Sequence, residues 1–216
     1  MRLIIVHGPP AVGKYTVSRE LSRQTGYLLM HNHLFFDFAS ELFEPFSPQF
    51  CELLQDLRVT CATSLARAGK PGAIMTICYD HPEDLELVSG VREAVEGLGG
   101  EVVAVQLVCE TDELLKRVTH PDRHSFRKVT NEQKLLGILE RWNLFTPIPE
   151  LPSIRIDNTE LSVESAVSRI IDFYELPVVS GTSVSTRVSK PRSGGCARAA
   201  DSASAASLDT EGESNG

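Results

Sequence analysis

The stretch RLIIVHGPPAVGKYTVSREL (Arg2–Leu21) joins an apolar run, a glycine-rich loop and an amphipathic segment. Its first five residues predict a short strand, and apolar side chains at Val17 and Leu21, four residues apart, favour a helix. Between these two elements the spacing G-x-x-x-x-G-K places two glycines before Lys14. This spacing forms a phosphate cradle when it connects a strand to a helix, and the order of elements predicted here meets that condition.

Each residue type in the loop has a physical task in phosphate binding. Gly8 and Gly13 lack a Cβ, so the backbone can adopt positive φ values and approach a ligand closely. The loop amides and the helix N-terminus then offer partial positive charge to a β-phosphate, Lys14 adds a full charge at the β/γ bridge, and Thr16 offers a hydroxyl to Mg²⁺. We expect ATP contacts from Gly8, Pro9, Pro10, Ala11, Val12, Gly13, Lys14, Tyr15 and Thr16, with Lys14 also acting in catalysis. The alternative is a glycine-rich turn that carries an exposed lysine.

Composition narrows the class of protein. The 216 residues are 42% hydrophobic and 23% charged, which is typical of a globular protein with one sizeable domain. No apolar run is long enough to span a bilayer or to form a secretory h-region, so we expect a cytoplasmic protein with no membrane partner. The net charge of −8 argues against a non-specific nucleic-acid binder, and the five scattered cysteines indicate neither a zinc site nor a disulfide framework.

The composition changes after Pro177. Residues 178–216 are rich in Ser, Ala and Gly and contain no Phe, Tyr, Trp or Ile. Such a segment cannot bury enough apolar surface to offset the entropy lost on ordering. We therefore predict a folded domain over residues 1–177 and a disordered tail over residues 178–216.

Short apolar runs alternate with longer amphipathic segments in the predicted domain, a pattern typical of βαβ units. The predicted strands are Leu3–His7, Tyr27–His31, Ala73–Tyr79, Val102–Val108 and Ile154–Ile156. The predicted helices are Lys14–Thr25, Phe50–Ala68, Asp84–Leu98, Asp112–Val118, Asn131–Phe145 and Ser162–Glu175. Together they predict an α/β fold with three layers (α/β/α) and a five-stranded parallel sheet.

Polar residues follow several of the predicted strands. These residues are His31-Asn32-His33, Asp80-His81 and Asp157-Asn158-Thr159. Ligands of open α/β sheets bind beyond the carboxyl ends of the strands. We therefore expect all three segments to converge on the glycine-rich loop.

The chain as a whole resembles a known group of enzymes over about residues 1–177. The resemblance rests on "GPPAVGKYT", "TGY…HNH…D", "RVTHPDRHSFRK" and "IDNTELSVESAVSRIIDFY". These motifs are similar to those of the small P-loop kinases, which include adenylate, shikimate and chloramphenicol kinases, and more closely to a branch described as kinase-like or AAA-type ATPases. The loop departs from the strict pattern because Tyr15 separates Lys14 from Thr16, as in the adenylate kinase version.

The resemblance implies a lid and a metal ligand. In the similar kinases, arginines of a lid fold over ATP, which implies that role for Arg117 and Arg123 in a lid of about residues 117–130. Guanidinium groups suit phosphate oxygens, but a basic run can also be a solvated surface. Asp80 follows a buried-looking strand and matches a carboxylate that holds Mg²⁺ through water, although an Asp before Pro82 can equally be a turn residue.

The resemblance also implies an acceptor-side segment at about residues 31–50. Related kinases carry a carboxylate near the end of the second strand, which suggests that Asp37 orients the acceptor and that His33 serves as the base; capping and core hydrogen bonds are the structural alternative. Six phenylalanines lie between residues 33 and 50, and they form either core or an apolar wall of the acceptor pocket. Asn158 lies where related kinases enclose the adenine.

These observations lead to one functional hypothesis and a rival. We expect a kinase that uses ATP and Mg²⁺ to phosphorylate a small-molecule acceptor, because a predicted arginine lid and a separate acceptor segment suit phosphoryl transfer. The rival is a nucleotide-binding regulatory ATPase that acts through a protein partner. A third alternative, a protein that has lost nucleotide binding, is disfavoured by the presence of both Lys14 and Thr16.

Overall fold

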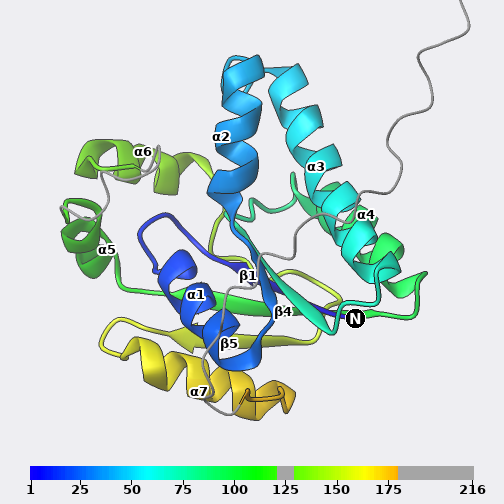
Figure 1. Cartoon of the computed structure of the whole chain (residues 1–216). Helices are drawn as coiled ribbons and strands as arrows, with labels where there is room; N and C mark the ends of the chain where they lie inside the picture. The colour runs from blue at the N-terminus through cyan, green and yellow to red at the C-terminus, as the bar shows by residue number, and fades with distance from the viewer. Residues whose placement is uncertain (121–128, 180–216) are drawn as a thin grey trace, which may run out of the picture. The chain divides into compact units, whose positions relative to one another are not determined.

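The computed structural model describes residues 1–120 and 129–179, all within one compact unit, Met1–Ser180. Its sheet has five parallel strands in the order β2-β3-β1-β4-β5 (Figure 1). The strands are β1 (Arg2–His7), β2 (Leu28–Met30), β3 (Gly72–Ile77), β4 (Glu101–Val108) and β5 (Ser153–Asp157). The predicted five-stranded parallel sheet is therefore confirmed.

Helices pack on both faces of the sheet. One apolar core contains the sheet residues Ile4 and Val6 with side chains of α1 (Lys14–Thr25), α5 (Thr111–Val118), α6 (Glu132–Arg141) and α7 (Val163–Tyr174). The opposite core contains Leu3 and Ile5 with side chains of α2 (Asn32–Leu42), α3 (Pro48–Arg67) and α4 (Leu85–Glu96). Successive side chains of β1 thus enter opposite cores, as strand geometry requires, and the α/β/α layering is confirmed.

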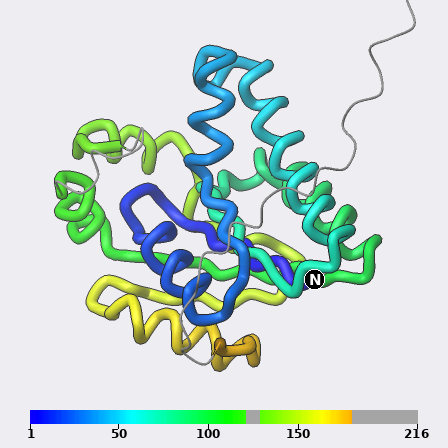
Figure 2. The backbone as a smooth tube through the Cα atoms, viewed as in Figure 1, coloured from blue at the N-terminus to red at the C-terminus, as the bar shows by residue number. Residues whose placement is uncertain are grey.

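The central strand β1 delivers the glycine-rich loop to one edge of the sheet. His7, its last residue, pairs with Ile77 of β3 and with Gln106 of β4. Both neighbouring strands therefore end close to the point where the loop begins. Figure 2 follows the backbone from β1 through this loop into α1.

Two helices differ from the sequence-based prediction. Residues Asn32–Leu42 form α2, which was not predicted, because the closely spaced phenylalanines obscured the helical period that buries Phe35 and Ala39. In contrast, α6 ends at Arg141 instead of Phe145, and Trp142 takes an extended conformation. The acceptor-side segment therefore begins as a helix that packs against α3 (Figure 1).

Within residues 1–120 and 129–179, no helix is long and apolar enough to cross a bilayer.

Candidate active site

The loop between β1 and α1 requires glycine at two positions. Gly8 has φ +142°, and a Cβ built on it would lie 2.2 Å from the carbonyl oxygen of Leu107 in β4. Gly13 has φ +96° and occupies the N-cap position of α1. L-residues with a side chain rarely adopt such conformations, so the backbone itself explains both glycines of the motif.

The N-terminus of α1 has the electrostatics of an anion-binding site. It lacks a side-chain cap, and no acidic residue lies in its first turn. The backbone N–H groups of a first turn have no partners within the helix, and the helix dipole adds partial positive charge there. These donors can hold phosphate oxygens.

Lys14, the first residue of α1, contacts the loop and β3. Its Nζ donates hydrogen bonds to the carbonyl oxygens of Gly8 (2.7 Å) and Pro9 (2.8 Å). The same ammonium lies 3.2 Å from the Sγ of Cys78, just after β3. No pattern in the sequence points to Cys78, because the contact joins residues 64 positions apart.

His7 is a second residue whose position the sequence did not reveal. Its side chain is buried at the end of β1, and neither ring nitrogen has a hydrogen-bond partner among the described residues. Burial, assisted by the charge of Lys14, lowers the pKa of His7 to about 4. The imidazole is therefore neutral near pH 7, and Lys14 is the positive charge at this point of the site.

A cavity of about 480 Å³ opens beside the loop and the start of α1. The first turns of α1 and residues of α5 and α7 form its walls, with charged side chains on the α5 side and apolar side chains on the α7 side. Its lining residues are Ala11, Gly13, Thr16, Val17, Glu113, Lys116, Arg117, His120, Asn158, Leu161, Ser162, Val163 and Ala166. The Thr16 hydroxyl is a hard oxygen ligand of the kind that Mg²⁺ prefers, so this predicted metal residue fits the cavity.

Asn158 joins the loop after β5 to the glycine-rich loop, and Arg117 joins the same loop to α5. The buried Asn158 donates from Nδ2 to the carbonyl oxygen of Val12 (2.7 Å), and its own backbone N–H is bound by β4. Arg117 donates to the carbonyl oxygens of Asn158 and Thr159, both at 2.9 Å, and to the carboxylate of Glu113. Both predicted nucleotide-site residues thus line the cavity, and their polar groups shape its wall.

Asp80 makes contacts of the kind expected from a turn residue. Its Oδ1 accepts from the backbone N–H of Asn143 (2.7 Å), and its own N–H donates to the carboxylate of Asp84 (2.8 Å). Burial raises the pKa of that Asp84 carboxyl. No hydrogen bond or ion pair in the described parts of the chain joins Asp80 to the glycine-rich loop, and its role as a Mg²⁺ ligand stays a prediction.

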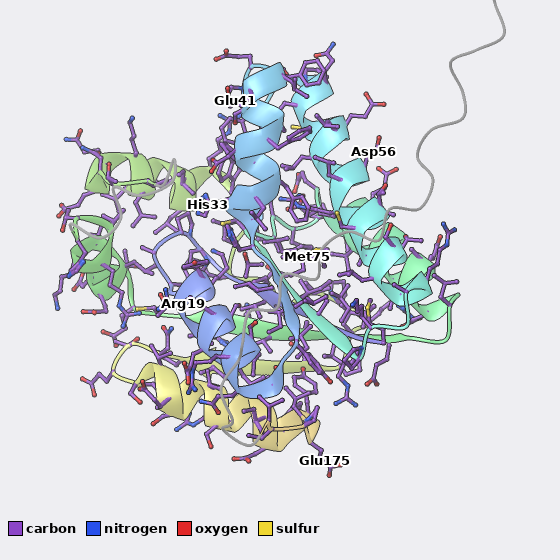
Figure 3. All side chains as sticks on the ribbon, viewed as in Figure 1. Arg19, His33, Glu41, Asp56, Met75 and Glu175 are labelled. Carbon is purple, nitrogen blue, oxygen red and sulfur yellow. The ribbon has the colours of Figure 1, made fainter. Side chains whose placement is uncertain are left out.

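The segment after β2 lies close to the start of α1. The rings of Tyr15 and His31 meet edge to face with centroids 5.0 Å apart, and those of His31 and His33 are 6.3 Å apart. His33 lies at the base of α2, at the sheet, whereas Glu41 marks the far end of this helix (Figure 3). This part of the predicted acceptor side therefore touches the start of α1 through Tyr15.

Asp37 follows His33 by one helical turn, which places both on one face of α2. Its Oδ1 is buried without a hydrogen-bond partner among the described residues. An unpartnered carboxylate oxygen is costly to bury. The position is thus suited to accept a hydrogen bond from a ligand hydroxyl, and the role predicted for Asp37 stays a prediction.

The phenylalanines of the acceptor side mainly join α2 to α3. Phe36, Phe46 and Phe50 pack ring against ring, with centroids 5.0 to 6.0 Å apart. Phe50 is fully buried, and Phe46 also meets Trp142. Phe46 and two other phenylalanines of this segment are nevertheless exposed, so the core interpretation holds for only part of the set, and an apolar wall around the acceptor stays a prediction.

Part of the predicted site lies outside the described residues. Arg123 and residues 121–128 of the predicted lid belong to this part, as do residues 180–216 of the predicted tail.

Comparisons with known proteins identify a fold. No family model and no curated protein matches the sequence. Solved structures do match: a sugar kinase from Janibacter sp. HTCC2649 is 16% identical with a TM-score of 0.61, covering 82% of this chain and 95% of that one. The tunicamycin resistance protein of Deinococcus radiodurans is 18% identical with a TM-score of 0.59, covering 83% and 99%.

A shikimate kinase from Bacteroides thetaiotaomicron also matches, with 17% identity, a TM-score of 0.54 and coverage of 81% of this chain and 98% of that one. The chain therefore has the P-loop fold found in small-molecule kinases. At this level of identity the comparison establishes the fold alone, and the expected kinship with AAA-type ATPases stays a prediction.

Proposed function

We propose that the protein is an ATP-dependent kinase that transfers the γ-phosphoryl group to a small-molecule acceptor. The proposal rests mainly on one observation: an uncapped helix N-terminus, reached through two obligatory glycines, opens on a cavity of about 480 Å³. A nucleoside can occupy such a cavity while its phosphates meet the N–H donors of the loop. The P-loop kinase fold supports the same assignment.

In this proposal the residues of the loop neutralise charge. Lys14 would exchange its bonds to the Gly8 and Pro9 carbonyls for phosphate oxygens, moving its charge to the group in transfer. Thr16 would bind Mg²⁺, which supplies charge neutralisation on the β- and γ-oxygens. Arg117 and Asn158 would keep the wall of the base pocket in place, and Arg123 would cover the phosphates.

The acceptor would bind beyond β2. His33 would take the proton of the reacting hydroxyl, and Oδ1 of Asp37, on the same face of α2, would orient the acceptor by accepting a hydrogen bond from a second hydroxyl. Fixing the hydroxyl in line with the γ-phosphorus supplies much of the catalysis in phosphoryl transfer. The aromatic packing of α2 against α3 would hold both side chains in place.

The test measures Mg²⁺-dependent ADP release by the full chain, with and without a pooled extract of small metabolites. We expect release that needs the pool, and a loss of roughly 10²–10³-fold in Lys14→Ala, because one charge-stabilising group is removed. Lys70→Ala, at an exposed lysine after α3, is the charge-matched control and should keep full activity. If the protein binds ATP but releases no ADP with any metabolite fraction, the kinase proposal is refuted and the regulatory ATPase is favoured.

Asp37→Asn tests the acceptor side separately. We expect it to lower kcat while ATP binding persists, because a neutral amide oxygen accepts a weaker hydrogen bond from a hydroxyl than a carboxylate does. Asp56→Asn, at an exposed position of α3, is its control (Figure 3). Equal activity of the two variants would remove Asp37 from the mechanism.

A further inference from the structure

Helix α2 carries a row of apolar side chains that faces solvent. Leu34, Phe38 and Leu42 follow one another at intervals of four residues, and more than half of the surface of each is exposed. Residues four apart lie on neighbouring turns of the same helix face. The three side chains therefore form one apolar ridge, about 12 Å long, which we call the α2 ridge.

The α2 ridge is distinct from the face of α2 that stabilises the fold. Phe35 and Ala39 are buried in the core, and the ring of Phe36 meets that of Phe50 in α3. An isolated exposed leucine is ordinary on a protein surface, whereas a contiguous apolar ridge is typical of an interaction site. Figure 1 shows α2 and α3 projecting together beyond the sheet, where a partner can approach the ridge.

The helical hairpin of α2 and α3 is also acidic. Residues 24–57 contain no Lys and no Arg. Their acidic residues are Asp37, Glu41, Glu44, Glu52 and Asp56. Glu41 follows Phe38 by three residues, which places it beside the α2 ridge at the end of the helix that lies far from the sheet (Figure 3). Glu44 is exposed just beyond that end, so the ridge has an acidic flank.

The geometry of the α2 ridge suits a second helix. Side chains at intervals of four residues form the ridges that pack into the grooves of another helix, which is the commonest mode of helix packing. An amphipathic helix offers apolar residues for such a contact at positions i, i+3, i+4 and i+7. The acidic flank favours Lys or Arg at the edges of that partner, because opposite charges across an interface speed association and fix orientation.

The same charges disfavour a second copy of this chain as the occupant of the ridge. A twofold dimer joins identical surfaces, so both sides of its interface would be acidic. The whole chain also carries a net charge of −8. Like charges brought together across an interface cost free energy, whereas a basic partner gains from them.

We propose that the α2 ridge and its acidic flank dock a basic amphipathic helix of another protein. Apolar residues of the partner would cover Leu34, Phe38 and Leu42, and its Lys or Arg side chains would lie beside Glu41 and Glu44. This interaction goes beyond the proposed kinase activity and does not depend on it.

Binding of a model helix tests the proposal. The probe is a fluorescein-labelled peptide of about 18 residues, made of Leu and Lys with leucines at i, i+3, i+4 and i+7, and the full chain is titrated into it while anisotropy is recorded. A second peptide has the same composition in an order without helical period, and a third has Glu in place of Lys. We expect the first peptide to bind at least tenfold more tightly than either of the others.

Serine substitutions assign this binding to the α2 ridge. Phe38→Ser and Leu42→Ser should each weaken binding of the first peptide at least tenfold, because each removes an apolar contact near the centre of the interface. Both residues are exposed, so neither substitution disturbs the core. Phe173→Ser, at a similarly exposed phenylalanine of α7, is the matched control and should leave the affinity unchanged.

Charge substitutions test the acidic flank. The double variant Glu41→Gln/Glu44→Gln should weaken binding of the first peptide and reduce its dependence on salt, because screening acts on exposed charges. Asp172→Asn/Glu175→Gln removes two exposed charges at the end of α7 and is the matched control. Equal salt dependence of the two double variants would overturn the role of the flank and with it the choice of a basic partner.

The wild type by itself can overturn the proposal. Equal binding of the three peptides would do so, as would a preference for the first peptide that survives in both serine variants. Sedimentation velocity and flotation with phosphatidylcholine vesicles test the other occupants of the ridge. A dimer or a vesicle complex that Phe38→Ser abolishes would assign the ridge to a second copy or to lipid, and a monomer that binds no vesicles supports the docking of a helix.

Discussion

The buried imidazole of His7 predicts a specific dependence of stability on pH. In the folded chain its pKa is about 4, against 6.5 ordinarily, because burial and the nearby charge of Lys14 disfavour the protonated form. Between these two values the unfolded chain binds a proton that the folded chain does not. His7 therefore destabilises the fold as the pH falls from 6.5 towards 4, and contributes no such loss at neutral pH and above.

The magnitude follows from the two pKa values of His7. Each pKa unit is worth about 1.4 kcal/mol, so complete titration costs about 3 kcal/mol, and lowering the pH from 7 to 5 costs about 2 kcal/mol. His7→Leu removes this pH-dependent loss of folding stability. It also relieves the burial of ring nitrogens without partners, which should raise stability at pH 7 by about 1–3 kcal/mol.

The assay is urea unfolding of the wild type, His7→Leu and His7→Asn at pH 7, 6 and 5, followed by circular dichroism. The three proteins share all other titratable groups, so the difference between their pH dependences of unfolding free energy reports on His7. We expect both variants to lose about 2 kcal/mol less than the wild type between pH 7 and 5, and only His7→Leu to gain stability at pH 7, because Asn keeps a buried polar group. Parallel pH dependence of all three proteins would refute a buried neutral imidazole.

Three further predictions concern the glycine-rich loop, each measured as the free energy of unfolding in urea. Gly8→Ala should cost more than about 2 kcal/mol, because its Cβ would lie 2.2 Å from the Leu107 oxygen; a loss below 1 kcal/mol would contradict this loop geometry. Ala11→Gly should stabilise the protein by about 1 kcal/mol, because Ala11 has φ +68°, a strained value for an L-residue; a destabilised variant would show that the methyl group matters more than the strain. Asn158→Ala should cost about 1–3 kcal/mol and weaken ADP binding, because the buried carbonyl of Val12 loses its donor; unchanged stability and ADP binding would contradict that role.

Much of the fold was predictable because its signals are local. The spacing of Gly8, Gly13 and Lys14 lies within seven residues, and both glycines are required by backbone conformation at their own positions. Alternating apolar runs and amphipathic segments likewise predicted five strands and six of the seven helices that the structure describes. The exception, α2, carries three closely spaced phenylalanines, which mask the helical period.

The site was less predictable because its contacts join distant parts of the chain. Asn158 reaches Val12 across 146 positions, Lys14 reaches Cys78 across 64, and Arg58 reaches Asn32 across 26. Spacing along the sequence carries no information about such pairs.

The sequence by itself determined the glycine-rich loop, the alternation of strands and helices, and hence the class of fold, since each depends on φ values and apolar periodicity within a few residues. Only the tertiary structure decided which polar groups are buried with no hydrogen-bond partner in the described parts of the chain, among them the ring of His7, the Nε of Arg58 and the Oδ1 of Asp37. The burial and hydrogen bonding of a group depend on every element that packs around it. Elements that are far apart in the sequence come together only when the parallel strands assemble into the sheet around β1.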